Sequence, residues 1–322
     1  MPSPTTDPRH RRRRAAGARA SALGDEEPNQ ARGRRRAGTA HVGVPSDQGP
    51  TDIPGDRPDE APRQAIEAAA AHRAPSPATP SPAAPRKPIA DRALADVTAD
   101  IVACRACPRL VEWRERVGRE KVARFAQWTY WARPVPGYGD SAAQILILGL
   151  APAAHGGNRT GRVFTGDRSG DVLYAAMYRA GLANQPSSVS VDDDLEVRGA
   201  YVTAAVRCAP PGNKPMPAER DRCLPYLVRE LRLLTEVRVL VALGAFGWDA
   251  GLRALAALGH QARPHPRFEH AAEARVGPYT LLGCFHPSQQ NTFTGRLTPS
   301  MVDDVLARAR SLAERPAGPA AD

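Results

Sequence analysis

The fold of this chain is decided by residues 144–171, QILILGLAPAAHGGNRTGRVFTGDRSGD. Four aliphatic residues in succession, Ile145 to Leu148, predict a strand that is buried on both faces, as in a parallel sheet. The strand runs directly into a loop that contains glycines together with a His, an Asn, two arginines, a Phe and an Asp. Open α/β sheets bind their ligands in such loops, at the carboxyl ends of the strands. The loop has neither GxxxxGKS/T nor GxGxxG, so a nucleotide-binding loop is not expected. A long connection without a role is the alternative.

A second strand followed by a polar loop lies near the other end of the chain. Residues 279–285, YTLLGCF, are mostly apolar and lead to His286. Pro287 then ends the strand, because proline cannot donate a ladder hydrogen bond. The loop that follows is polar and carries Asn291, Thr294, Gly295 and Arg296. A lone His at a strand end is commonly structural, but two such loops favour one shared site.

Strand and helix patterns alternate between these segments. Strands are predicted at 200–206 and 237–243 besides the two above, and helices at 89–102, 109–126, 171–180, 217–235, 246–258 and 299–313. This order predicts an α/β fold with a parallel or mixed sheet and helices on both faces.

The composition changes sharply near residue 90. Residues 1–90 are rich in Arg, Pro and Ala and lack apolar periodicity, so we expect a disordered basic tail. Residues 91–314 are long enough for one α/β domain, and residues 315–322 are expected to be a disordered C-terminus.

Charge and targeting signals bound the cellular context. The net charge of the 322-residue chain is +10, which suits a polyanionic partner such as nucleic acid, although basic surfaces are also common without one. The N-terminus lacks an apolar signal region, and no apolar run is long enough to span a membrane. We therefore expect a soluble, intracellular protein. We also expect it to be a monomer in the cytoplasm that associates with the nucleoid through DNA binding.

Five cysteines are present. Cys284 lies among strand residues and reads as a small core side chain. The other four, Cys104, Cys107, Cys208 and Cys223, match one four-coordinate centre. Spacing alone leaves structural zinc and a [4Fe–4S] cluster equally open.

Three separated motifs, together with these cysteines, resemble the uracil-DNA glycosylase superfamily. They are GLAPAAHGGNRTGRVFTGD at 149–167, AAVRCAPPGNKP at 204–215 and HPSQQNTFTGRLT at 286–298. The closest branch is family 5, the iron–sulfur type also called type-5, and the resemblance spans roughly residues 93–312. It implies a three-layer α/β/α fold with a four-stranded, mostly parallel sheet. It also implies a [4Fe–4S] cluster on the four cysteines, and base-excision repair of DNA.

The departures from related branches bear on specificity. Family 4 begins its first motif with GEAPG, where this chain has Gly149-Leu150-Ala151-Pro152-Ala153. The uracil-reading Asn of families 1 and 4 corresponds here to Ala204. Loss of that amide should weaken strict discrimination of uracil. It fits the broader range attributed to family 5, which includes hypoxanthine and other deaminated or damaged bases.

Cleavage of an N-glycosidic bond passes through an oxocarbenium-like sugar. The site must therefore stabilise negative charge on the departing base and place a water near the sugar. His286 is predicted to donate to a base carbonyl as a neutral imidazole. Asp167 is predicted to position the water, and Asn213 to hold that water or the base. The alternatives are a helix N-cap for Asp167 and a turn residue for Asn213.

The remaining candidates would bind the substrate. Phe164 is predicted to stack on an extruded base, or alternatively to anchor its loop as a core aromatic. The backbone of Gly149, Ala151 and Ala153 should line the pocket. Asn291, Arg296 and Leu297 are predicted to enter the DNA groove. Arg159, Arg162 and Lys214 are candidates for phosphate contact, unless they are merely solvated.

We therefore expect a monofunctional DNA glycosylase, because neither catalytic loop contains a lysine nucleophile. Lys214, beside Asn213, leaves a lyase side activity open. One alternative is an iron–sulfur DNA-binding module without catalysis, which would need His286 and Asp167 only for folding. Another is a metal-dependent hydrolase, but HxxH and HExxH are absent from the predicted domain.

Overall fold

The computed structural model describes residues 88–314. The predicted disordered segments therefore lie outside the described residues, except that the first helix, α2 (Pro88–Ala103), begins just inside the segment assigned to the tail. Among the described residues, no helix is long and apolar enough to cross a membrane.

Four parallel strands form the centre of the sheet, as the sequence predicted. β2 (Ile145–Gly149), β3 (Ala200–Ala204), β4 (Val239–Leu243) and β6 (Tyr279–Cys284) pair in the order β3-β2-β4-β6. Each of the first three is buried along its whole length, so neither face is left to solvent.

Two antiparallel edge strands extend the sheet to six strands in the described part of the chain. β1 (Tyr138–Gly139) pairs with β3, and β5 (Glu273–Val276) pairs with β6. The prediction of four strands was wrong at both edges. β1 has only two residues, and β5 (EARV) has no apolar run because it is mostly open to solvent.

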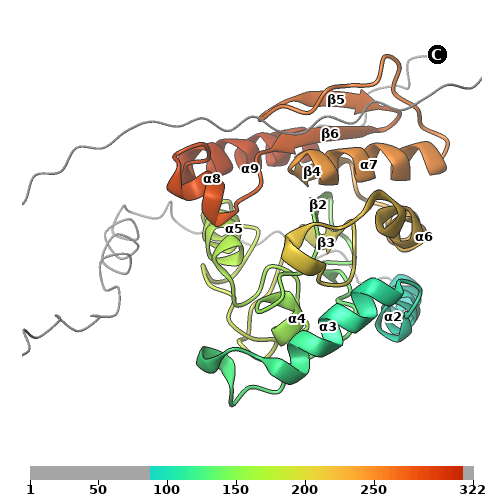
Figure 1. Ribbon diagram of the computed structural model, residues 1–322. Coiled ribbons are helices and arrows are strands. Elements are labelled where there is room, and N and C mark those ends of the chain that lie inside the picture. The colour runs from blue at the N-terminus through green and yellow to red at the C-terminus, as the bar shows by residue number, and fades with distance from the viewer. Residues whose placement is uncertain (1–87, 315–322) are drawn as a thin grey trace, which may run out of the picture. The chain divides into compact units, whose positions relative to one another are not determined.

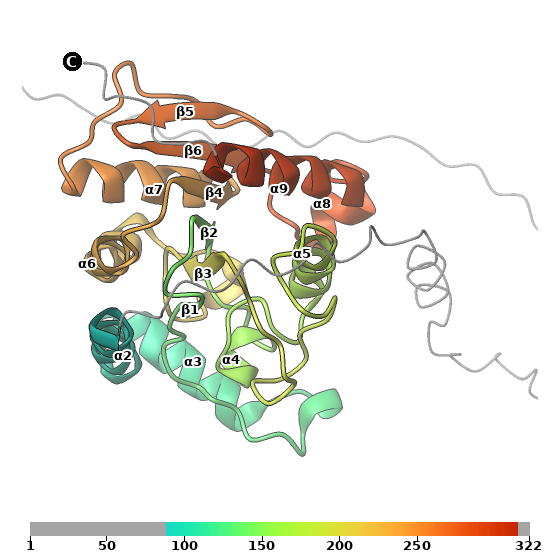
Figure 2. The same cartoon turned by 180° about the vertical axis from the view of Figure 1, so that it is seen from behind.

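Helices cover both faces, which confirms the three-layer arrangement (Figures 1 and 2). α5 (Arg168–Arg179) and α9 (Pro299–Glu314) lie on one side, where they pack against Ile145 and Ile147. α6 (Pro217–Leu233) and α7 (Ala245–Ala257), with α2 beside α6, lie on the other side, where Leu146 and Leu148 point. Because side chains along β2 point alternately to the two faces of the sheet, this one strand contributes to the hydrophobic core on each face.

One longer helix and four short elements lie among the loops of the described residues. They are α3 (Pro108–Glu120), η1 (Ala123–Phe125), α4 (Gly157–Thr160), η2 (Pro211–Asn213) and α8 (Gln289–Phe293). Helix α3 ends before the predicted residue 126, because Lys121 has a left-handed φ of 54°. β2, β3, β4 and β6 run in the same direction, so their carboxyl ends share one edge of the sheet.

Candidate active site

Phe164 and His286 meet at this carboxyl edge, although they are far apart in the sequence. Phe164 lies in the long loop after β2, and His286 follows β6. Their ring centroids are 6.0 Å apart, with 36° between the ring planes. The predicted convergence of the two loops is therefore confirmed.

The Phe164 ring lies directly against the backbone of Gly149, the last residue of β2. A Cβ atom on Gly149 would be 2.6 Å from Phe164 Cζ, so only glycine allows this approach. Phe164 itself has a φ of 52°, a left-handed conformation that is unfavourable for a bulky residue. Such strain persists where the surroundings impose it, often at functional sites.

His286 is half-buried, and hydrogen bonds hold its backbone. Its carbonyl oxygen accepts hydrogen bonds from Asn291 Nδ2 at 2.8 Å and from the Ser288 backbone N–H at 2.8 Å. Ser288 in turn caps α8 by accepting from the Asn291 backbone N–H. Burial lowers the pKa of His286 to about 4, because the charged imidazolium loses hydration. The ring is therefore neutral near pH 7.

Asp167 is the N-cap of α5, which was the alternative interpretation of this residue. Its Oδ1 accepts from the Gly170 backbone N–H at 3.0 Å, and the helix consequently begins at Arg168 rather than at residue 171. The carboxylate also lies against Gly156, where a Cβ would be 2.0 Å from Oδ2. Burial raises the pKa of Asp167 above its ordinary value. Capping one N–H leaves the carboxylate able to accept other hydrogen bonds.

Three predicted contact residues in the second loop are placed differently from one another. Leu297 is 1% exposed and packs in the core on the α9 side, so it presents no side chain to a DNA groove. Asn291 holds the His286 carbonyl, as described above. Arg296 is exposed, with its guanidinium carbon 4.6 Å from the centre of the Phe285 ring.

Two of the three predicted phosphate contacts are buried. Arg159 is 3% exposed and donates to the carbonyl oxygens of His155 and Gly166, at 2.8 and 3.0 Å. Arg162 is also buried and pairs with Asp193 at 2.6 Å. Both arginines therefore organise the loop from within, and the prediction of phosphate contact was wrong for them. Lys214 is exposed.

Asn213 lies on the exposed turn η2, with a φ of 56°. Within residues 88–314, no hydrogen bond or ring contact joins it to Phe164, Asp167 or His286. Its neighbour Lys214 accepts a hydrogen bond at its carbonyl from Arg109 Nη2, on the α3 side, at 3.2 Å. Asparagine tolerates left-handed backbone, so the turn interpretation has geometric support.

The loop after β2 connects this site to the cysteines. Beyond the strand ends, the Ala205 and Val206 N–H groups donate to the Gly149 and Leu150 carbonyls, at 2.9 and 3.0 Å. The predicted pocket residue Ala153 accepts from Gly156 and Asn158 in the next turn. The other, Ala151, packs against the cysteine group.

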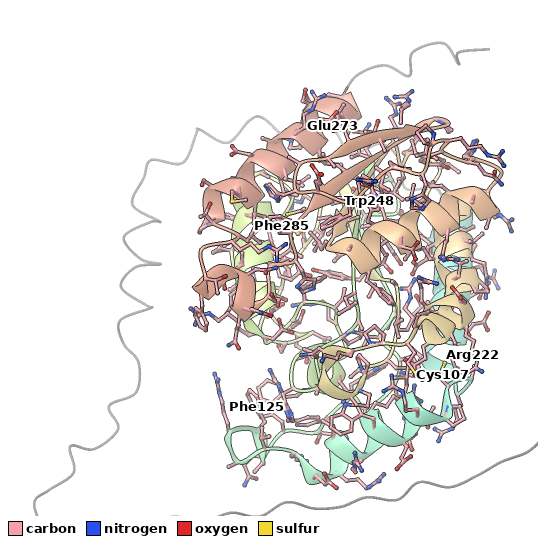
Figure 3. The ribbon with its side chains drawn as sticks, turned by 45° about the horizontal axis from the view of Figure 1, so that its top comes forward. Cys107, Phe125, Arg222, Trp248, Glu273 and Phe285 are labelled. Atoms are coloured by element: carbon pink, nitrogen blue, oxygen red, sulfur yellow. The ribbon has the colours of Figure 1, made fainter. Side chains whose placement is uncertain are left out.

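Three of the four predicted ligand thiols, those of Cys107, Cys208 and Cys223, are buried in one cluster with Leu110 and Val206. Figure 3 labels Cys107, the member of this cluster that precedes α3. Cys104 is partly exposed, and Cys284 is buried in the separate core cluster on the α9 side, as expected. In the described part of the chain, no three His, Cys, Asp or Glu side chains are arranged to hold a single metal ion. A four-iron cluster binds each cysteine through a different iron, so its thiolates need not converge on one point.

The charges around these thiols fit an anionic cluster. Arg114 is 2% exposed and donates from Nη1 to Cys208 Sγ at 2.9 Å. Its nearest carboxylate, Glu115, is 3.9 Å away, and its Nε has no partner among residues 88–314. A buried guanidinium of this kind is stabilised by thiolate charge. The Arg207 backbone N–H also bonds Cys223.

Sequence reasoning missed Arg114, which lies in a segment noted only as charged and helical. It also missed His155, which shares a 3.0 Å hydrogen bond with the Tyr130 hydroxyl, and the aromatic residues before β1. The concentration of aromatic residues in QWTYWARP, 127–134, was the available signal.

An aromatic ring, a neutral imidazole and a carboxylate follow strands of a parallel sheet, and these are groups that an enzyme of the DNA glycosylase class can use to hold an extruded base and stabilise its departure. The chain belongs to the uracil DNA glycosylase superfamily, whose family model matches residues 136–310, and to its type-5 branch.

Curated relatives place it in that branch. The chain is 56% identical over 223 residues to the type-5 uracil-DNA glycosylase of Mycobacterium tuberculosis, which covers 69% of this chain and 82% of that protein. It is 53% identical over 214 residues to the type-5 enzyme of Thermus thermophilus, covering 66% and 95%. A type-4 uracil-DNA glycosylase of Pyrobaculum aerophilum matches only 117 residues, at 33% identity, covering 36% and 51%.

Proposed function

We propose that this protein is a monofunctional DNA glycosylase that hydrolyses the N-glycosidic bond of uracil and of other deaminated or damaged bases, such as hypoxanthine, and leaves an abasic site. The pairing of Phe164 with His286 over Gly149 carries this proposal, because it sets a stacking surface beside a hydrogen-bond donor. Relatives named as type-5 uracil-DNA glycosylases, at 53–56% identity, support the choice of uracil.

Recognition of an extruded base would rest on shape more than on specific amide contacts. The Phe164 ring offers a face on which any base can stack. Ala204 ends β3 directly opposite Gly149 and is 2% exposed, so no side-chain amide reads the base from this position. A pocket without that amide supports a substrate range wider than uracil.

His286 would stabilise the departing base. As the glycosidic bond breaks, negative charge develops on the base carbonyl oxygens, and a preorganised N–H donor stabilises it. A neutral imidazole donates through one nitrogen without being a strong acid, and burial keeps His286 in that form. The hydrogen bonds to its carbonyl fix the backbone of His286 before the substrate arrives.

Asp167 would act on the sugar side. A carboxylate can accept a hydrogen bond from the attacking water and offset positive charge on the oxocarbenium-like sugar. The cap to Gly170 fixes its orientation. Asn213 remains a candidate for holding the water or the base. No lysine stands in either loop that forms the site, which supports hydrolysis by water without a covalent amine intermediate.

We also propose that Cys104, Cys107, Cys208 and Cys223 hold a [4Fe–4S] cluster. When bound, the cluster would supply a covalent cross-link between segments rather than a step of hydrolysis. Arg114 would balance its charge, and the main-chain bonds between residues 149–150 and 205–206 would transmit the order of the cysteine loop to the pocket.

A single-turnover assay tests the proposal, with duplex oligonucleotides that carry uracil, hypoxanthine or an undamaged base. We expect heat-labile abasic product from the damaged duplexes, no strand cleavage without heat, and no borohydride-trapped complex. Iron and sulfide analysis of the same preparation tests the cluster. Absence of product on every damaged base, from protein with intact iron, would refute the enzymatic role.

A further inference from the structure

Exposed arginines on aromatic rings surround the candidate active site. The guanidinium carbon of Arg124 lies 5.1 Å from the centre of the Phe125 ring. Arg168 lies 4.6 Å from the Phe293 ring. Arg296 and Phe285, already described, form a third pair. We call these three pairs, together with Trp128, the arginine–aromatic rim.

Residues of the rim are connected to the candidate active site through sequence neighbours and through Arg159. Arg168 directly follows Asp167, and Phe285 directly precedes His286, which places two pairs next to catalytic candidates. Across the site, buried Arg159 lies 4.0 Å from the Phe125 ring and 4.1 Å from the Trp128 ring, and donates to the Gly166 carbonyl. In Figure 3, Phe125 lies near the lower edge of the fold and Phe285 lies above it, nearer the middle.

In the described part of the chain, the rim arginines lack carboxylate partners, in contrast to two exposed arginines elsewhere in the fold. Arg179 pairs with Asp303 at 2.7 Å, and Arg308 pairs with Glu273 at 2.6 Å. Within residues 88–314, Arg124, Arg168 and Arg296 form no salt bridge. Asp171, in the first turn of α5, attracts both Arg124 and Arg168 without reaching salt-bridge distance of either. These guanidinium groups are therefore available to an anion.

The rim also exposes aromatic surface to water. Phe293 is 66% exposed and Trp128 is 39% exposed. Exposed aromatic side chains beside unpaired arginines are the combination that binds single-stranded or distorted nucleic acid, with rings stacking on bases and cations on phosphates. Extrusion of a nucleotide produces such a distortion, because it leaves neighbouring bases without a stacking partner.

We propose that the rim binds the DNA strand on both sides of the extruded nucleotide. Arg124 and Arg168 contact phosphates, while Trp128 and Phe293 stack on the bases left unstacked. Phe293 has the role that the sequence analysis predicted for Leu297, which is to enter the DNA. The Leu297 side chain is buried in the core and does not reach the DNA. This inference rests on the proposed function, since it assumes that the substrate is DNA.

Equilibrium binding tests the rim separately from catalysis. The probe is a fluorescein-labelled duplex with one tetrahydrofuran residue, a stable abasic analogue, and anisotropy is read at several KCl concentrations. Arg124→Ala should weaken binding and lower the slope of log Kd against log salt by about one, as expected for one lost phosphate contact. Phe293→Ala and Trp128→Ala should each raise Kd by about 5- to 100-fold.

Matched variants separate these effects from damage to the fold. Arg232, also exposed, lies on α6 in the opposite layer, so Arg232→Ala should leave Kd and the salt slope unchanged. Arg124→Lys should restore the slope, and Trp128→Phe should restore most of the affinity, because charge and ring are retained.

The outcomes are distinguishable. Rim variants that bind as tightly as Arg232→Ala, from protein that cleaves uracil normally, would overturn the inference alone. Wild-type protein that binds the duplex through the rim but releases no base would support the inference and refute the proposed enzymatic activity.

Discussion

Replacing Gly149 by alanine adds one methyl group beneath the Phe164 ring and changes no chemical group in the site. The methyl carbon would lie 2.6 Å from Phe164 Cζ and 2.7 Å from Cε2. Carbon atoms in contact are about 3.5–4.0 Å apart, so the ring must move by about 1 Å. The φ of Gly149 is not in the left-handed region, so the backbone itself tolerates alanine.

The displacement should appear mainly as lost catalysis. A misplacement of about 1 Å costs about 100-fold in rate, or about 3 kcal/mol of activation free energy. The free energy of unfolding should fall by about 1–3 kcal/mol, the usual cost of overpacking.

Single-turnover base release from a uracil duplex measures the rate effect, and thermal denaturation measures stability. Gly251→Ala is the control, because its new methyl would press on Leu281 Cδ1 at 3.1 Å, in the core against α7 and away from Phe164. If Gly149→Ala acts through the ring, it should cost little in a Phe164→Ala background. A wild-type rate in Gly149→Ala, or full additivity in the double variant, would refute the reasoning.

Further predictions concern His286, Asp167 and the cysteines. His286→Phe should slow base release by about 10²–10³-fold. In the wild type, protonation of His286 should reduce the rate of base release only as the pH falls towards 4, the value to which burial lowers its pKa. An inflection of the pH–rate profile near pH 6.5 that is absent from His286→Phe would contradict this prediction. Because its pKa in the unfolded chain is higher, His286 should also make the folded state less stable as the pH falls from 6.5 towards 4, which acid denaturation of wild type and variant can compare. Asp167→Asn keeps an acceptor for the Gly170 N–H, so the melting temperature of this variant should stay close to that of the wild type while its rate of base release falls. Asp167→Ala should show the same loss of rate and also lose about 0.5–2 kcal/mol of stability, because the cap is removed. A wild-type rate in Asp167→Asn would leave capping as the only role of Asp167. Cys208→Ser should lose the visible absorbance and bound iron of the proposed [4Fe–4S] cluster, and Arg114→Met should lower the reduction potential of that proposed cluster by removing a positive charge beside Cys208. An unchanged potential in an iron-replete Arg114 variant would show that this charge does not act on the proposed cluster.

The central fold was predictable because its signals are local. The apolar run from Ile145 to Leu148 can be buried only between two layers, and its alternation supplies both cores. The edge strands were not predictable in this way. β5 pairs through its backbone while its side chains largely face solvent, so it has no apolar pattern to detect.

The sequence predicted which residues form the candidate site better than it predicted how they are arranged. The sequence indicated that Phe164 and His286 belong together, and the structure places their rings 6.0 Å apart. It left Asp167 open between a helix cap and a catalytic residue; the structure shows the cap, and the catalytic role stays a prediction.

The sequence by itself determined the parallel sheet, the two loops that meet at its carboxyl edge, and the membership of the family, because apolar periodicity and motif residues are properties of short segments. Only the tertiary structure decided which polar and apolar side chains reach solvent. Arg159 and Leu297 are buried, whereas Arg168 and Phe293 are exposed. Burial depends on which distant segments pack against a residue, and neither residue type nor spacing along the chain specifies those partners.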